Sequence, residues 1–332
     1  MHWQTILRKN FTRAAALTTF LELSQKHVEE LDITPTFPMS VPVRLAQKME
    51  KRTTNDPIFK QFVPSKKELL NTPHFSQDPI EEMLFLQSEK LLHKYPKRML
   101  LVTTSSCAMH CRFCFRRNFP YETTHPHFDK ELALIQKDHS IEEIILSGGD
   151  PLSLSDRALS ELFTELNTIE HLQRIRFHTR FPIGIPERIN EPFLELLQST
   201  TKQIVFVIHS NHPKEFDEEV WESLHKIQKL GIPILNQSVL LKGVNDDVQT
   251  QKELLQALVN HGVIPYYLHA LDKVAGAAHF DVPQATGKRL INELAKTLSG
   301  YAVPKFVREI PGKPSKTILV KLNFMLTKYQ QT

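Results

Sequence analysis

Short apolar runs alternate with amphipathic stretches along the middle of the chain. Six runs rich in Ile, Leu and Val have the length and character of buried strands, and they span 98–104, 141–147, 174–180, 203–209, 232–241 and 263–269. Between them, apolar residues recur at helical spacing, for example over 155–169, 186–198, 214–231 and 246–262. The last two stretches end at Gly231 and Gly262, and glycine is favoured just beyond a helix. Six strand–helix units in series predict an α/β fold with a parallel sheet, a partial or complete TIM-like barrel of the (β/α)6 type.

The two ends of the chain have different patterns. Residues 1–94 are predicted to be mainly helical, because apolar residues recur at helical spacing over 17–25 and 78–95 and prolines punctuate the sequence between them. Residues 301–332 contain two extended runs around a loop rich in Pro, Gly and Lys. We therefore predict three parts, which are an N-terminal helical region (1–94), the barrel (95–300) and a short C-terminal segment (301–332).

Polar side chains gather at the carboxyl ends of the predicted strands. The functional groups of an α/β barrel lie at this end. The polar groups that follow or close the six runs are the three cysteines, the SGGDP segment, His178, Arg180, His209, Gln237, His269 and Asp272. The barrel prediction therefore brings these residues to one side of the molecule.

The composition is that of an ordinary globular protein, with 41% hydrophobic and 23% charged residues among 332. Lys and Arg exceed Asp and Glu by 41 − 37 = 4, without the basic blocks that mark a nucleic-acid site. No apolar run approaches the roughly 20 residues that span a membrane, and the N-terminus lacks the apolar core of a secretory signal. Three clustered cysteines do not form a disulfide framework. We therefore expect a cytoplasmic protein that binds neither nucleic acid nor membranes.

All three cysteines lie within eight residues, as C-x3-C-x2-C at Cys107, Cys111 and Cys114. Thiolates prefer iron or zinc to hard ions. A closed zinc site needs four ligands, and His110 is a candidate for the fourth, while three buried thiols without a metal are another interpretation. Alternatively, the three thiolates hold a [4Fe–4S] cluster and leave one iron open to a chelating small molecule.

The CxxxCxxC spacing after the first strand resembles the signature of the radical S-adenosylmethionine superfamily. The SGGDPL segment at 147–152 resembles the motif with which that superfamily contacts the methionyl amine of S-adenosylmethionine. The resemblance implies a [4Fe–4S] cluster on the three cysteines, with S-adenosylmethionine at its open iron. It also implies contacts between S-adenosylmethionine and residues at neighbouring strand ends, namely Ser147, Gly148, Gly149, Asp150, His209 and Gln237.

Further segments resemble the lysine 2,3-aminomutase family of that superfamily. They include YPKRMLLVTTSSCAMHCRFCFRR, HSNHP, NQSVLLKGVND, PYYLHALD and SGYAVPKFVREIPGKPSKT, and together they cover most of the chain. The resemblance implies a pyridoxal 5′-phosphate enzyme, an isomerase of the intramolecular aminotransferase type. It places this cofactor on Lys316, with Lys313 as the alternative because residues 312–315 depart from the family's run of glycines. Arg98 and Arg180 match arginines near the cofactor.

The resemblance also implies a site for the amino acid lysine. Arg116 matches the arginine that binds the substrate carboxylate. Asp272 and Glu309 match the acidic pair that holds the distant ammonium, although the family pattern has Asp at the second position. His269 stands where the family has a tyrosine against the cofactor ring.

The short region after Thr317 and the segments YYLHALDKVAGAAHF and PSKT resemble the branch of the family that supplies (R)-β-lysine for the modification of elongation factor P. This resemblance implies a functional link to elongation factor P and its lysine ligase, and an external electron donor such as flavodoxin or ferredoxin. The sequence leaves a homo-oligomer open. The alternatives are a catabolic or biosynthetic lysine or glutamate 2,3-aminomutase, although the acidic pair disfavours glutamate, and a noncatalytic iron–sulfur protein.

Overall fold

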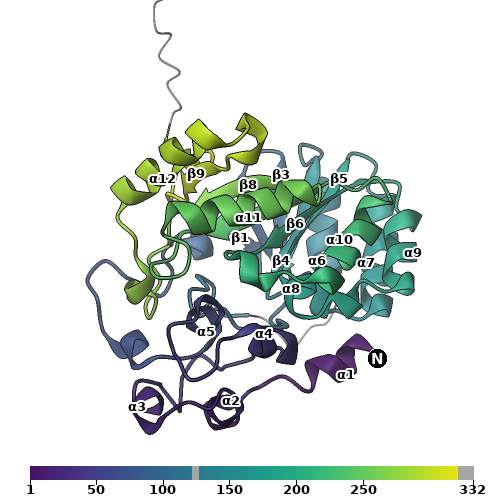
Figure 1. Ribbon diagram of the computed structural model, residues 1–332. Helices are drawn as coiled ribbons and strands as arrows, with labels where there is room; N and C mark the ends of the chain where they lie inside the picture. Colours follow the sequence, from purple (N-terminus) through teal and green to yellow (C-terminus); the bar gives the residue numbers. More distant parts are fainter. Residues whose placement is uncertain (122–126, 321–332) are drawn as a thin grey trace, which may run out of the picture.

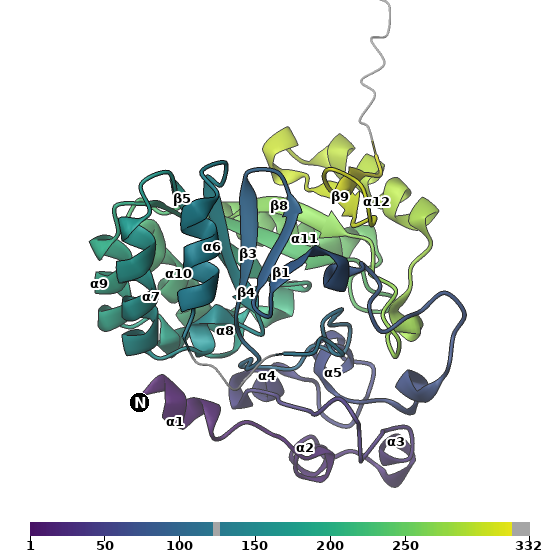
Figure 2. The same ribbon diagram turned by 180° about the vertical axis from the view of Figure 1, so that it is seen from behind.

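The computed structural model of the chain describes residues 1–121 and 127–320, and one sheet runs through its centre (Figures 1 and 2). The described residues form ten strands whose order in the sheet follows their order in the sequence. The strands are β1 (Leu86–Ser88), β2 (Leu91–Tyr95), β3 (Arg98–Thr104), β4 (Glu143–Gly148), β5 (Arg174–Thr179), β6 (Gln203–His209), β7 (Ile234–Val239), β8 (Ile264–His269), β9 (Lys305–Arg308) and β10 (Thr317–Ile318).

The six predicted strands are present as β3 to β8. These six strands pair with one another in parallel, and β9 continues this arrangement beside β8. Strands β1, β2 and β10 add antiparallel pairs at the two ends of the order. Because β1 and β10 stand at opposite ends and do not pair with each other, the barrel is open. The expected α/β fold with a partial TIM-like barrel is thus confirmed.

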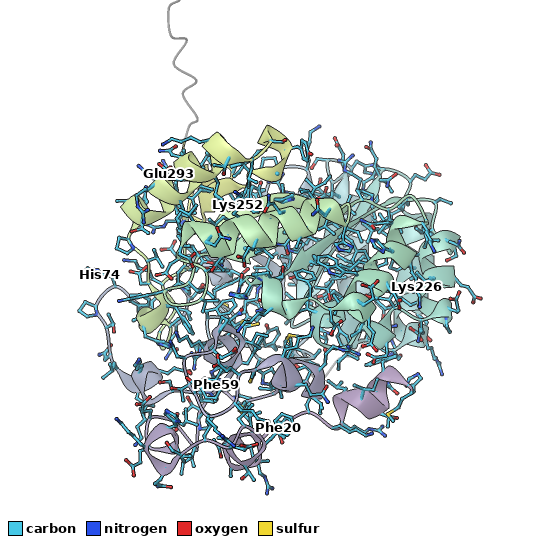
Figure 3. The ribbon with its side chains drawn as sticks, in the orientation of Figure 1. Phe20, Phe59, His74, Lys226, Lys252 and Glu293 are labelled. Atoms are coloured by element: carbon cyan, nitrogen blue, oxygen red, sulfur yellow. The ribbon has the colours of Figure 1, made fainter. Side chains whose placement is uncertain are left out.

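Helices line the sheet along its length (Figure 1). Helices α10, α11 and α12 contact β7, β8 and β9, and Figure 3 shows Lys226, Lys252 and Glu293 at the outer surface of these three helices. The α-helices are α1 (Trp3–Leu7), α2 (Ala14–Phe20), α3 (Gln25–Val28), α4 (Val43–Lys48), α5 (Pro57–Phe62), α6 (Asp129–Lys137), α7 (Asp156–Thr168), α8 (Phe181–Gly184), α9 (Glu191–Ser199), α10 (Glu218–Gln228), α11 (Val248–Asn260) and α12 (Gln284–Thr297). Short 3-10 helices are η1 (Lys66–Leu69), η2 (Glu82–Phe85), η3 (Pro151–Ser153), η4 (Pro186–Arg188), η5 (Pro213–Glu215), η6 (Ala278–Phe280) and η7 (Gly300–Ala302). No helix in the described part of the chain has the length and apolar character that crossing a membrane requires.

The barrel helices begin and end at the residues that favour these positions. Side-chain oxygens directly before four helices accept hydrogen bonds from backbone N–H groups of the first turn, and these capping residues are Ser155, Asn190, Asp217 and Asp247. Gly231 and Gly262 follow α10 and α11 with φ values of 76° and 70°, a backbone conformation in which glycine has no steric cost. The predicted helix ends are therefore confirmed.

The helical prediction for residues 78–95 is wrong. This segment contains η2 and then the hairpin formed by β1 and β2. Leu91 of β2 is fully buried and pairs with Leu101 of β3, so the hairpin extends the edge of the sheet. The edge of a neighbouring strand offers both burial and backbone hydrogen bonds. This stabilisation outweighs the local preference for a helix that the spacing of apolar residues indicates.

The remaining N-terminal region contains five short α-helices and η1, joined by irregular segments, and lies below the sheet in Figure 1. Over 17–25 the prediction is only partly right, because α2 ends at Phe20 and Glu22 has a left-handed φ of 54°. The region also contacts the loop that carries the cysteines, since the backbone N–H of His110 donates to the carbonyl of Ser40. The division into three parts at the stated boundaries stays a prediction.

Candidate active site

One large cavity, of about 800 Å³, lies against one face of the sheet. Every residue that the sequence assigned to a site lines it, and these are Cys107, Cys111, Cys114, Arg98, Arg116, Ser147, Gly148, Gly149, Asp150, Arg180, His209, Gln237, Asp272, Glu309 and Lys316. We call the part around the three cysteines the cysteine end, and the part around Lys316, Glu309 and Asp272 the lysine end.

The cysteine loop is held in place by buried contacts from the N-terminal region. The side chain of Arg112 is fully buried and donates to both carboxylate oxygens of Glu68, at 2.8 and 2.6 Å. Its backbone N–H donates to the carbonyl of Gln61 in α5. Removing a partner from such a buried ion pair leaves an uncompensated charge, so the loop is rigid where the cysteines need a fixed geometry.

The three thiols lie close enough together to influence one another. Burial raises the pKa of each, that of Cys114 to about 11, and negative charge on Asp150 and on the other two cysteines raises the pKa of Cys107 further. The guanidinium of Arg180 opposes this effect at Cys111, because its Nη1 lies 3.0 Å from the Sγ atom. Buried thiols of this kind become thiolates when a metal replaces their protons.

The arrangement suits a cluster better than a single ion. Among residues 1–121 and 127–320, no three His, Cys, Asp or Glu side chains are grouped closely enough to hold one metal ion. His110, the candidate fourth zinc ligand, places its Nδ1 2.9 Å from the carbonyl of Pro38 and stacks on Phe37. A [4Fe–4S] cluster distributes its cysteines over different irons, so three thiols that share a cavity without converging on one point fit it.

The two glycines after β4 are required by the cysteine loop. A Cβ atom on Gly149 would lie 2.4 Å from the carbonyl oxygen of Ser106, and one on Gly148 would lie 2.8 Å from that of Thr104. The same close approach allows the N–H of Gly149 to donate to Thr104 and that of Asp150 to donate to Ser106. The sequence suggested that these glycines admit a ligand, but the space of their missing side chains is filled by the neighbouring backbone.

Replacing Gly149 with alanine should therefore lower the free energy of unfolding by about 1–3 kcal/mol, because backbone rather than a flexible side chain must move. Thermal denaturation of the purified protein measures this effect. Gly300→Ala is the matched control, since its Cβ would meet nothing within 4 Å. Equal melting temperatures for the two variants would contradict the tight packing of the two loops.

Asp150 ties the ends of β4 and β5 together. Its carboxylate accepts hydrogen bonds from Thr179 Oγ1 at 2.7 Å, from the N–H of Arg180 at 2.7 Å and from the N–H of Leu152 at 3.0 Å. Burial raises the pKa of this carboxyl to about 6, and the three donors hold it from rising further. Asp150 thus sets the position of the backbone around the glycines.

At the lysine end, Glu309 is the centre of a charged group. It accepts hydrogen bonds from Lys316 Nζ at 2.8 Å and from the hydroxyl of Tyr95, and it forms an ion pair with Lys94 Nζ at 3.0 Å. Burial alone would raise the pKa of Glu309, but Lys316 and the other two donors outweigh it and lower the pKa to about 2. Lys313 is exposed and lies outside the cavity lining, whereas Lys316 faces the cavity.

Asp272 lies in the same part of the cavity. Burial raises its pKa to about 7, although the positive charge of Lys316 opposes the shift. Glu82 and Glu309 add to the rise, and Lys94 reduces it. The site thus holds one ionised and one half-protonated carboxyl near neutral pH.

Two arginines converge on Tyr267 at the inner side of the cavity. The guanidinium of Arg98 lies 4.7 Å from the ring centre of Tyr95. Burial raises the pKa of Tyr267, and the positive charges of Arg98 and Arg176 partly oppose this rise. The Nε of Arg176 is buried without a partner among the described residues. Nη2 of Arg176 pairs with Glu143 at 2.5 Å, so its Nε is the donor left for a ligand. Guanidinium groups are suited to a phosphate.

The sequence did not indicate Arg176, and the resemblance placed Arg180 near the cofactor. The structure places Arg180 at the cysteine end, where it contacts Cys111, Gln61 and Glu215. The strand pattern contained a signal for Arg176, because alternate residues of β5 share one face and His178 lies two positions further on. Glu82 and Glu215 gave no such signal, since they are distant in sequence from the groups that they pair with.

The middle of the cavity is lined by polar groups that lack protein partners. His209 Nε2 lies 3.4 Å from His178 Nδ1, while His178 Nε2 and Gln237 Oε1 have no hydrogen-bond partner in the described part of the chain. Burial and the nearby guanidinium groups lower the pKa of His209 to about 3, and burial also lowers that of His178. Neutral, unpaired polar atoms of this kind fit a polar ligand.

Comparison with known proteins shows similarity over nearly the whole chain. Residues 101–255 match the Radical SAM superfamily. The chain is 42% identical to an L-lysine 2,3-aminomutase of Haemophilus influenzae over 322 residues, which are 96% of this chain and 95% of that one. It is 44% identical to the L-lysine 2,3-aminomutase of Escherichia coli over 85% of this chain and 83% of that one. The L-lysine 2,3-aminomutase of Clostridium subterminale is 32% identical over 95% of this chain and 77% of its own length.

Proposed function

Because this chain belongs to the L-lysine 2,3-aminomutase family of radical SAM enzymes, we propose that it converts L-α-lysine to (R)-β-lysine in the cavity described above. Members of the family are isomerases that use a [4Fe–4S] cluster, S-adenosylmethionine and pyridoxal 5′-phosphate. The observation that carries the proposal is the cavity itself, because three thiols, a partly buried lysine and an acidic pair line it. A noncatalytic iron–sulfur protein would need only the thiols.

The bound cofactors supply a carbon-centred radical and a conjugated ring that can delocalise an unpaired electron. Cys107, Cys111 and Cys114 are the residues that would hold the cluster. The neutral His209 and the unpaired Gln237 line the adjacent wall and would donate and accept hydrogen bonds to S-adenosylmethionine.

At the lysine end, Lys316 supplies the amine that binds pyridoxal phosphate, and its distance of 2.8 Å to Glu309 fixes the Nζ atom in the cavity. Arg98, with Arg176 beside it, would bind the phosphate group. Arg180 does not belong to this set in our proposal, since its donors are directed to Cys111 and to its other partners at the cysteine end.

The substrate would lie between a guanidinium and the acidic pair. Arg116 would bind the α-carboxylate, because its guanidinium lines the cavity and a guanidinium can bind a carboxylate through two nitrogens. Asp272 and Glu309 would hold the distant ammonium of lysine. Glutamate carries a carboxylate in place of that ammonium, and two acidic side chains would repel it.

Asp272→Asn should raise the KM for lysine by about tenfold or more, since one partner of a buried charge pair is lost. In the wild-type enzyme the KM should fall as the pH rises through about 7, because Asp272 then ionises and can bind an ammonium. The asparagine variant should lose this dependence. Steady-state kinetics between pH 6 and 8 measures both effects, with Asp281→Asn outside the cavity as the control.

The direct test of the proposed reaction is anaerobic reconstitution with iron, sulfide, pyridoxal phosphate, S-adenosylmethionine and a reductant. Incubation with L-lysine should yield β-lysine of R configuration on chiral chromatography, and L-glutamate should yield no β-product. Formation of β-glutamate, or a lack of any amino acid isomer, would contradict the proposal.

For the biological role, we propose that the product is used by a separate lysine ligase to modify elongation factor P in the cytoplasm. The support is the resemblance of the segments at 266–280 and 314–317 to the branch of the family with this role. Flavodoxin or ferredoxin would supply the electron. Deletion of the gene should remove the β-lysyl group from elongation factor P, as measured by intact mass. An unchanged mass would favour a catabolic or biosynthetic role.

A further inference from the structure

The guanidinium of Arg116 is already bound along one edge by a protein carboxylate. Its Nε and Nη2 donate to the two carboxylate oxygens of Glu82 at 2.7 and 2.6 Å, and its Nη1 donates to Ser147 Oγ at 3.0 Å. Both side chains of the ion pair are buried, with 7% of Arg116 and 9% of Glu82 exposed. This pair was not predictable from the sequence, because 34 residues separate its members.

A count of hydrogen-bond donors shows what remains for a ligand. A guanidinium has five N–H donors, and Glu82 and Ser147 together use three. The remaining two are one on Nη1 and one on Nη2. These two terminal nitrogens are the ones that bind a second carboxylate end-on, so the pairing with Glu82 leaves the end of Arg116 available.

The segment that carries Glu82 is fixed on both sides. Within it, Asp78 accepts the backbone N–H of Glu82 at 3.0 Å, and Lys94 of β2 donates to the carbonyl of Ile80 at 3.0 Å. Further back, the N–H of Ser76 donates to the carbonyl of Lys273, beyond β8. The carboxylate of Glu82 is thus supported by the fold and is not a mobile side chain that happens to meet Arg116.

We propose that Glu82 is a positioning residue that holds Arg116 by its Nε–Nη2 edge and directs the Nη1–Nη2 end at the substrate α-carboxylate. The inference rests on the proposed function, in which Arg116 binds that carboxylate. Glu82 also neutralises the buried guanidinium when no substrate is present, so the binding group stays extended in the empty cavity. The alternative is that the carboxylate of Glu82 occupies the position of the substrate α-carboxylate and has to be displaced from Arg116 before the substrate binds. The anchored segment and the two free donors argue against it.

The test compares two ligands of the reconstituted holoenzyme by equilibrium dialysis. L-Lysine has the α-carboxylate, and 1,5-diaminopentane lacks it but keeps both amines. Glu82→Gln should weaken lysine binding by about tenfold and change diaminopentane binding by less than about twofold. Steady-state kinetics should show the same rise in KM with kcat nearly unchanged, a division that a general loss of structure would not produce.

Glu81→Gln is the matched control, because Glu81 is adjacent to Glu82 in the sequence but its side chain is exposed. This variant should bind both ligands as the wild type does. If Glu82→Gln fails to fold, Glu82→Asp replaces it, since it keeps the charge but is one methylene too short for both nitrogens. Unchanged or tighter lysine binding, or equal weakening for both ligands, overturns the inference. A wild-type enzyme that binds no lysine would instead contradict the proposed function.

Discussion

Lys316→Ala should reduce the formation of β-lysine by about 10³-fold or more, because the amine that binds pyridoxal phosphate is lost while the rest of the cavity is kept. The fold should survive, since Glu309 retains Lys94 and Tyr95 as partners after Lys316 is removed. Activity is measured on the reconstituted enzyme. Borohydride reduction followed by peptide mass spectrometry shows which lysine carries the cofactor.

Lys313→Ala is the matched control for this variant. Lys313 lies three residues earlier in the same loop, but its side chain is exposed and lies outside the cavity lining. It should therefore keep full activity and full cofactor content. If Lys313→Ala lost the cofactor and Lys316→Ala kept it, the lysine that binds pyridoxal phosphate would be Lys313.

Cys111→Ser should have an effect of similar size, again about 10³-fold or more in activity, because a serine hydroxyl is a poor ligand for iron compared with a thiolate. The variant should also bind little iron and sulfide after anaerobic reconstitution, and it should lack the electron paramagnetic resonance signal of a reduced cluster. The chain has three cysteines and all of them line this part of the cavity, so no fourth cysteine can replace Cys111.

Ser106→Ala tests whether any change in this loop has the same result. Ser106 is exposed, and its structural contact is made by the backbone carbonyl, which the substitution keeps. Its iron content and activity should equal those of the wild type. Full activity of Cys111→Ser with a normal iron content would exclude the cysteine end as the site of the cluster.

The strand–helix alternation made the barrel predictable from the sequence. Buried parallel strands need nearly continuous apolar runs, and the helices that cover them need an apolar stripe, so both patterns are local. The cysteine spacing and the SGGDP segment lie in loops that directly follow these strands. For that reason the sequence could predict that they meet, and both line the cavity. The role of Lys316 came from the family resemblance and not from the strand pattern.

Contacts between segments distant in sequence were not predictable in this way. Residues 86–95 form a hairpin because the edge of β3 offers partners, and a spacing within the segment does not contain that information. The same limit applies to charged pairs. Arg180 and Arg116 are equally visible as arginines, but their roles depend on Glu215 and Glu82, which only the folded chain brings within 2.7 Å of them.

The sequence by itself determined the family and the six buried strands, and it indicated the residues that we propose for the chemistry, because spacing within a short segment is enough to specify a motif or a buried strand. The tertiary structure alone decided how these residues are used. It placed Arg180 beside Cys111, added Arg176 to Arg98, filled the space of the two glycines with the cysteine loop and paired Arg116 with Glu82. Hydrogen bonds and charge pairs act over a few ångströms in space, so distance along the chain does not reveal them.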